Sequence, residues 1–190
     1  MKFDVLYVDP PWQYNNKKMG GSHKSGASQK YTTMSLQQLI DLKQYIDPVV
    51  KNNSCLFLWG TTPMLPEAFQ LMKAWGYKYK TLFTWDKGGY KTGYWFRGQT
   101  EHCLFGIKGR VAAFRSGEKN IFFEKSESHS KKPIAMWGII KKVLWNKEVL
   151  ELFATQQSKP LWTRIGKEVT GNDIIFDLKQ LVHDHYVIKS

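Results

Sequence analysis

Short apolar runs alternate with helical patterns along this chain, and that alternation restricts the fold more than any other feature. The runs short and apolar enough to be strands are residues 3–8, 54–59, 78–85, 102–107, 149–153 and 162–165. Helical patterns lie between some of them, from Ser35 to about Lys43, from Pro63 to about Trp75 and from Pro133 to about Trp145. This order predicts an α/β fold of three layers, in which helices cover both faces of a largely parallel sheet.

The remaining segments are expected to be loops and a tail. Residues 13–30 are polar and contain glycines, which predicts a mobile substrate loop. Residues 86–100 are rich in glycine and aromatic residues, and residues 108–131 are basic. We expect both to be substrate-facing loops, the second with a short strand at 121–123. Residues 170–190 are expected to form a tail that packs as a helix with a frayed end.

The length and cysteine content suit one domain in a reducing compartment. A chain of 190 residues can bury a core without disulfides or metal, and no repeat or linker divides residues 1–190. Cys55 and Cys103 are too few for a disulfide framework or a four-ligand zinc site, so we expect free, buried thiols. Asp4, in a short apolar run, argues against a secretion signal. The expected location is the cytoplasm of a bacterial cell or of a phage-infected host.

The charge balance predicts a polyanionic partner. The chain carries 28 Lys and Arg against 16 Asp and Glu, a formal net charge of +12, and 15% of its residues are aromatic. A basic surface that also carries aromatic rings is typical of nucleic-acid binding. Most of the cations are lysines, which suit phosphate contacts better than base reading. No apolar run approaches the eighteen residues of a membrane span, so we expect no membrane partner.

A rigid turn follows the first predicted strand, with the sequence Asp9-Pro10-Pro11-Trp12. In open α/β sheets, ligands bind outside the carboxyl ends of the strands. The two prolines fix the backbone there. We therefore expect the Asp9 carboxylate, the Pro10 carbonyl and the Trp12 ring to face outward together as a candidate catalytic group.

These groups suit methyl transfer to an exocyclic amine. The amine of adenine is a poor nucleophile because its lone pair is delocalised into the ring. A carboxylate and a carbonyl that accept its two protons would favour a tetrahedral nitrogen, and an aromatic ring would hold the base. A sulfonium methyl donor in line with that nitrogen would complete a direct displacement without any metal.

The chain resembles a known methyltransferase family, that of the seventy-kilodalton subunit of mRNA adenosine methyltransferase (MT-A70), and in particular its compact bacterial and phage members. The likeness spans about residues 3–169. Beside the tetrapeptide at Asp9, it rests on the segments 31–35, 56–59, 74–77, 93–97, 101–104, 129–133 and 151–154. The resemblance implies a Rossmann-like fold that uses S-adenosylmethionine. It also implies a circular permutation, because the catalytic turn comes early and the cofactor strand late.

The same resemblance implies where the cofactor binds. It places Lys132 on the methionine carboxylate, residues that follow the late strand around the adenosine, and the segment after Gly166 near the ribose. Thr155 and Lys167 depart from the family, which often has Arg and Asn at these places. The cofactor-binding residues that we expect are Val8, Asp9, Lys132, Phe153, Thr155, Gln156, Gln157, Ser158, Lys167 and Glu168.

Candidate substrate-binding residues lie in two of the expected loops. Lysines beside the catalytic turn suit a phosphate backbone, and an aromatic residue near an arginine suits stacking and phosphate contact. The residues are Tyr14, Lys17, Lys18, Lys24, Lys30, Tyr31, Trp95 and Arg97. His102 is expected to be a core histidine, and we expect no metal at the terminal pair His183 and His185.

Four functions remain open at this stage. The leading one is adenine-N6 methylation of DNA, with RNA adenine methylation as the second. A cytosine-amine methyltransferase would more often carry Ser at position 9, and a non-catalytic nucleic-acid-binding module would be expected to lack the Asp9 carboxylate. The sequence leaves the oligomeric state open, a homo-oligomer included.

Overall fold

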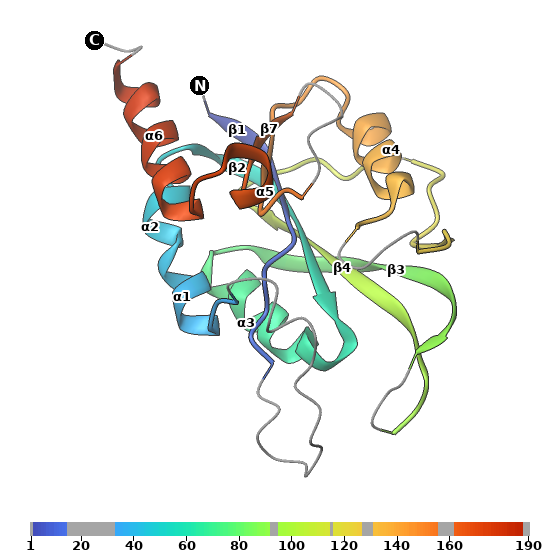
Figure 1. The fold of residues 1–190 in the computed structure, drawn as a ribbon. Helices are drawn as coiled ribbons and strands as arrows, with labels where there is room; N and C mark the ends of the chain where they lie inside the picture. The colour runs from blue at the N-terminus through green and yellow to red at the C-terminus, as the bar shows by residue number, and fades with distance from the viewer. Residues whose placement is uncertain are drawn as a thin grey trace.

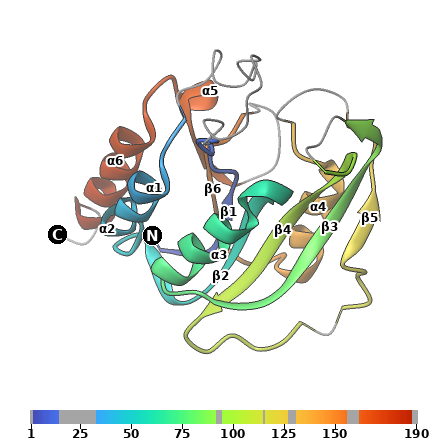
Figure 2. The same cartoon turned by 90° about the horizontal axis from the view of Figure 1, so that it is seen from below.

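The computed structural model describes residues 2–14, 33–91, 95–114, 116–126, 131–155 and 162–187. Its centre is a seven-stranded sheet in the order β5-β3-β4-β2-β1-β6-β7 (Figures 1 and 2). The strands are β1 (Phe3–Val8), β2 (Val50–Thr61), β3 (Lys78–Lys91), β4 (Gly98–Lys108), β5 (Ile121–Phe123), β6 (Val149–Leu152) and β7 (Thr163–Ile165).

Helices cover both faces of this sheet, as the sequence predicts. Helices α1, α2, α3 and α6 lie on one face and α4 on the other (Figures 1 and 2). The bounds are α1 (Leu36–Asp41), α2 (Lys43–Ile46), a 3₁₀ turn η2 (Thr62–Met64), α3 (Leu65–Ala74), α4 (Ile134–Val143), α5 (Lys167–Thr170) and α6 (Ile174–Val187). The three-layer α/β fold is therefore confirmed. None of the described helices is long and apolar enough to cross a membrane.

The central strands contain continuous apolar runs because each of their faces meets a separate core. In β1, Leu6 and Val8 belong to the core beneath α1 and α3, whereas Val5 and Tyr7 belong to the core beneath α4. All four side chains are at most 1% exposed. Strands buried on both faces show continuous apolar runs instead of alternation, which explains why β1 was recognisable from its sequence.

Six of the seven strands run in the same direction. β1 is parallel to β2 and β6, β6 to β7, and β3 to β5, while β4 is antiparallel to both of its neighbours. The carboxyl ends of β1, β2, β3, β5, β6 and β7 therefore meet at one edge of the sheet, together with the start of β4. The candidate catalytic turn lies at this edge.

The prediction of a loop at residues 86–100 is wrong over most of that range. Strand β3 continues to Lys91, and β4 already begins at Gly98. Gly88 and Gly89 are residues that favour loops, and both have positive φ. They nevertheless lie inside the long β3–β4 hairpin, at an irregularity where the register shifts between Asp86 and Lys91. The register gives residues 87–90 no partner in β4, and pairing resumes where Lys91 faces Gly98, so the two glycines form a bulge within the hairpin.

Several element boundaries follow from local chemistry. Ser35 caps α1 in a capping box with Gln38, and Gly76 has a φ of 86° just past α3. The helix predicted from Ser35 to Lys43 is divided at Leu42 into α1 and α2. The expected short strand at 121–123 and the helical tail are present as β5 and α6. The sequence did not indicate α5.

The turn after β4 provides a test of backbone strain. Gly109 has a φ of 68°, and a Cβ there would lie 2.2 Å from Asn53 Oδ1 and 2.5 Å from the carbonyl oxygen of Asn52. We expect Gly109→Ala to lower the free energy of unfolding by about 1–3 kcal/mol. Gly117→Ala, where a Cβ meets nothing within 4 Å, should change it by less than about 1 kcal/mol. Equal urea midpoints for the two variants would contradict this account.

Candidate active site

The turn at Asp9 begins where β1 ends between two parallel neighbours. Val8 pairs with Leu58 of β2 and with Leu152 of β6, so the next residue projects beyond three strand ends. The turn is held by backbone bonds. The Trp12 amide donates to the Pro10 carbonyl at 2.8 Å, and the Met34 amide donates to the Pro11 carbonyl at 2.8 Å. The rigid position expected for Asp9 is therefore present.

Trp12 does not face outward with the carboxylate, which corrects the sequence expectation. Its side chain is 6% exposed and packs in the core beneath α1 and α3. Its indole Nε1 donates a hydrogen bond to the backbone oxygen of Trp59 at 3.1 Å. Burial of such a large ring is worth more to the fold than its exposure, so Trp12 anchors the turn and leaves little ring surface for a base.

Asp9, Glu101 and Lys132 form a buried charge cluster that includes a residue the sequence analysis did not single out. Lys132 Nζ lies 2.9 Å from Asp9 Oδ1 and 3.7 Å from Glu101 Oε2. The three side chains are only 13–22% exposed. Lys87 lies 3.9 Å from the other oxygen of Glu101. The sequence feature that could have identified Glu101 was a charged residue at the start of an apolar strand.

The alternation of strand residues brings this cluster together. Glu101 and Cys103 lie on the α4 face of β4, and Trp59 lies on the same face of β2. Lys132 immediately precedes Pro133, the N-cap of α4, and its Nζ lies 5.4 Å from the centroid of the Trp59 ring. Residues far apart in the sequence thus meet where the α4 face reaches the sheet edge.

Burial and neighbouring charges shift the pKa values of both partners in the Asp9–Lys132 ion pair. Burial raises the pKa of the Asp9 carboxyl; Lys132 opposes this shift and Glu101 adds to it. Burial disfavours the charge on Lys132, but Asp9 and Glu101 outweigh it, so the pKa of Lys132 is raised. The ammonium therefore stays charged. Among the described residues, Lys132 is the only donor to the Asp9 carboxylate, through Oδ1, which leaves Oδ2 for a donor from a ligand.

Tyr14 lies beside this cluster, as expected from its distance to the turn. Its hydroxyl is 2.8 Å from Thr61 Oγ1 at the end of β2, and its side chain is 37% exposed. Burial of the hydroxyl raises the pKa of Tyr14, with a further contribution from Glu101. Of the predicted substrate-binding residues that the structure describes, Tyr14 is therefore the one that lies beside the turn.

The two segments expected around the cofactor meet at the ends of β6 and β7. The Ala154 amide donates to the Ile165 carbonyl at 2.9 Å. Gly166, at a φ of 151°, approaches so closely that a Cβ would lie 2.7 Å from the Ala154 nitrogen. Phe153 is the one described non-glycine residue with positive φ, at 60°. Strain of this kind, directly after the strand, is typical of functional sites.

The other predicted cofactor-binding residues are less closely packed or lie outside the described residues. Lys167 and Glu168 are exposed on the short helix α5, and Thr155 is half-buried after Ala154. Gln156, Gln157 and Ser158 lie outside the described residues, as do the substrate candidates Lys17, Lys18, Lys24, Lys30 and Tyr31.

A second buried ion pair lies beneath the cofactor segments and was not foreseen. Glu151 and Arg164 are in register on β6 and β7, with Arg164 Nε 2.8 Å from Glu151 Oε2. The guanidinium lies 5.3 Å from the Trp137 ring of α4. The Arg164 side chain is 6% exposed, and its two terminal nitrogens are buried without a hydrogen-bond partner among the described residues. Unpaired buried donors of this kind are costly unless a ligand satisfies them.

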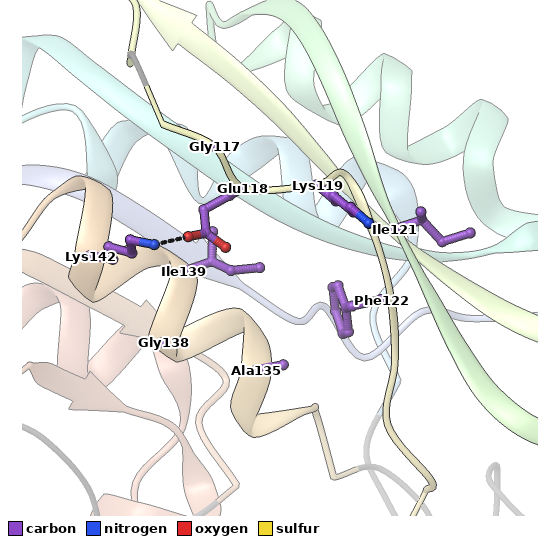
Figure 3. Close-up of a pocket in the computed structure, with 9 residues that line it drawn as sticks. All are labelled: Gly117, Glu118, Lys119, Ile121, Phe122, Ala135, Gly138, Ile139 and Lys142. Carbon is purple, nitrogen blue, oxygen red and sulfur yellow. Dashed lines mark hydrogen bonds and ion pairs between the residues drawn. The ribbon is translucent and has the colours of Figure 1, made fainter.

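The open pockets lie elsewhere. One of about 400 Å³ lies between β5 and α4, lined by Glu118, Lys119, Phe122, Ile139 and Lys142 among others (Figure 3). Another, of about 430 Å³, lies between the start of α6 and the segment that leads into α1. Neither is lined by Asp9, Glu101 or Lys132. His102 has Nδ1 3.2 Å from Thr84 Oγ1, but it is half-buried and belongs to neither core, so the expectation of a core histidine is only partly met. The described residues contain no cluster of three metal-type ligands.

Comparison with known proteins decides the family. The sequence profile of MT-A70 matches residues 3–168. The chain belongs to the MT-A70 family. It is 30% identical to the type II methyltransferase M.MunI of a Mycoplasma species, over 91% of this chain and 80% of that protein. It is 26% identical to the human N6-adenosine-methyltransferase catalytic subunit METTL3, over 99% of this chain but 33% of that protein, and 25% identical to the Arabidopsis thaliana MT-A70-like enzyme, over 24% of that protein.

MT-A70 proteins are adenine-N6 methyltransferases with S-adenosylmethionine as the methyl donor, and the described residues fit this cofactor. Its sulfonium and ammonium groups are cations, which suit the Asp9 carboxylate oxygen that Lys132 leaves without a donor. Its carboxylate and hydroxyls are acceptors, and Arg164 has unpaired donors. Gly166 lets the backbone after β7 approach Ala154 more closely than any residue with a side chain could. When bound, the cofactor supplies an electrophilic methyl group.

Replacing Asp9 tests whether the cluster holds the reacting amine. Asp9→Asn keeps the shape but removes the charge, so we expect turnover to fall by about 10²- to 10⁴-fold, the scale of a lost proton acceptor. Cofactor affinity, measured by calorimetry, should fall much less than turnover. Cys55→Ser, at a buried thiol far from the turn, is the control. Near-normal turnover of Asp9→Asn would exclude the role.

Glu101 offers a test by pH. Asp9 acts in its charged form, so its raised pKa means that activity is lost on the acidic side at a higher pH than for an ordinary aspartate. Glu101→Gln removes a charge that raises this pKa, and the acidic limb of kcat/KM should move to lower pH. Asp184→Asn, at an exposed acid on α6, should leave the limb in place. Any titration of the substrate itself affects the wild type and both variants equally. An acidic limb at the same pH in the wild type and in Glu101→Gln would therefore refute the coupling between Glu101 and Asp9.

Proposed function

We propose that this protein transfers a methyl group from S-adenosylmethionine to the exocyclic N6 amine of adenine in DNA. The observation that carries the proposal is the Asp9 carboxylate, fixed by Lys132 through Oδ1 at the meeting point of three strand ends. Its second oxygen has no protein donor among the described residues. A carboxylate in this position is suited to accept a proton of the amine.

Each residue of the cluster has a distinct part in the proposed reaction. Lys132 holds the Asp9 carboxylate in one orientation, and Glu101 keeps Lys132 in place through a second, longer contact. The Pro10 carbonyl accepts one bond from Trp12, but a carbonyl oxygen has a second lone pair for the amine. An ammonium has three donors, so Lys132 retains one for the cofactor carboxylate. Arg164 offers further donors on the side of β7.

DNA is the proposed substrate for two reasons. The chain aligns with most of a type II methyltransferase, which supports DNA, whereas it aligns with a third or less of the N6-adenosine methyltransferases, which support RNA. The net charge of +12 suits a phosphate backbone. RNA adenine methylation is the second candidate, because the similarity to METTL3 covers 99% of this chain.

We also propose that the chain is a circular permutation of the usual methyltransferase order. Asp9 directly follows β1, the first strand, and the cofactor segment follows β6, the sixth, although the two strands are neighbours in the sheet.

The substrate is tested with labelled S-adenosylmethionine and with DNA and RNA of matched sequence, followed by mass spectrometry of the nucleosides. The proposal predicts N6-methyldeoxyadenosine from DNA, at a much higher rate than N6-methyladenosine from RNA, and a rate at least about 100-fold lower with Asp9→Asn. Methylation of RNA alone would establish the second candidate instead. Methylcytosine as the product, or no transfer by a protein that binds the cofactor, would overturn the proposal.

A further inference from the structure

Three large aromatic side chains stand in solvent at the rim of the candidate site. Trp95 is 85% exposed, Phe96 88% and Phe123 68%. We call these three residues the aromatic rim. Single exposed apolar residues are common, but several gathered at one edge of a molecule usually mark a contact surface.

The strand order places the aromatic rim on the same edge as Asp9. Phe123 is the last residue of β5 and pairs with Asp86 near the end of β3. Trp95 and Phe96 lie just before Gly98, where β4 begins. Three residues further along β4, Glu101 contacts Lys132. The rim and the charge cluster therefore lie at the same edge of the sheet.

The backbone beneath the rim is braced. Asp86 Oδ1 accepts hydrogen bonds from the Gly88 amide at 2.9 Å and from Gln99 Nε2 at 2.7 Å, which ties β3 to β4. A Cβ at Gly88 would lie 3.0 Å from the ring of Phe123. The glycine thus makes room for the Phe123 ring against β3. A frame of paired strands presents exposed rings at low entropic cost to binding.

The charged side chains beside the aromatic rim indicate which kind of partner binds there. Arg97 follows Phe96 and Lys125 closely follows Phe123, and both side chains are exposed. Flat apolar rings interleaved with cations match the unstacked bases and phosphates of a nucleic acid. Bases inside a duplex do not expose their faces, so the matching form is an unpaired strand.

We propose that the aromatic rim stacks on unpaired bases next to the target adenine, so that the protein binds single-stranded or locally opened nucleic acid more tightly than closed duplex. This inference rests on the proposed function for the position of the target base. It assigns Phe96 and Phe123 to the substrate surface beside Trp95, and it defines the strand state that the site accepts.

The test measures binding without cofactor, by fluorescence anisotropy of a labelled single strand and of its duplex. The variants are Trp95→Ala with Phe96→Ala, and Phe123→Ala. The matched control is Trp145→Ala: this tryptophan is 80% exposed, but it lies between α4 and the start of β6, at the opposite edge of the sheet. All these side chains are exposed, and equal melting temperatures would verify the folds.

The wild type should prefer the single strand. The double variant should bind the single strand about 10- to 100-fold more weakly, while the salt dependence keeps its slope because no phosphate contact is lost. Phe123→Ala should weaken single-strand binding in the same direction, and Trp145→Ala should bind normally. Unchanged affinity of the rim variants, an equal loss in the control, or a wild type that prefers duplex would overturn the inference. So would a wild-type dimer that the rim variants dissociate, because the rim would then cover a second copy.

Methyl transfer, measured separately, distinguishes the two proposals. A wild type that methylates DNA while the rim variants bind single strands normally would refute the inference alone. A rim that binds single strands in a protein that transfers no methyl group would refute the proposed function alone.

Discussion

The site depends on one buried ammonium held between two carboxylates. Lys132 precedes α4, Asp9 follows β1 and Glu101 begins the apolar part of β4, so their contacts join three separate parts of the chain. A charge buried in this way is costly unless it is paired, and removal of one partner would leave the others uncompensated. The arrangement orients the Asp9 carboxylate and keeps one of its oxygens available, which the proposed chemistry requires.

A layer of aromatic residues supports that cluster from below. Trp59 lies beneath Lys132, and its indole Nε1 donates to the Tyr7 hydroxyl at 2.8 Å. Trp12 donates in turn to the backbone oxygen of Trp59. The turn, β1 and β2 are therefore fastened by indole hydrogen bonds within otherwise apolar cores. Such satisfied polar contacts in a low-dielectric interior restrict the geometry more than apolar packing alone does.

The sequence allowed prediction of the parts that local rules govern. β1 was predicted with the right bounds because it is buried on both faces, and the starts of α1 and α4 followed from Ser35 and Pro133. The position of Asp9 at a strand end followed from the two prolines. The long β3–β4 hairpin was missed because Gly88 and Gly89 predict a loop, whereas they form an irregularity in β3 and pairing with β4 resumes beyond them, at Lys91 and Gly98. Glu101, Arg164 and the burial of Trp12 were missed for a related reason. Their partners are distant in the sequence, and no spacing rule connects them.

The central claim is that burial and Glu101 raise the pKa of Asp9 while Lys132 holds it in place and limits that rise. Carbon-13 NMR of the labelled carboxyl group, in the free protein and in Lys132→Met, measures this directly. The account predicts that Asp9 titrates above the range of an ordinary aspartate in the wild type and at a still higher pH in the variant, because Lys132 lowers its pKa. An ordinary or depressed pKa in the wild type, or one that Lys132→Met leaves unchanged, would contradict it.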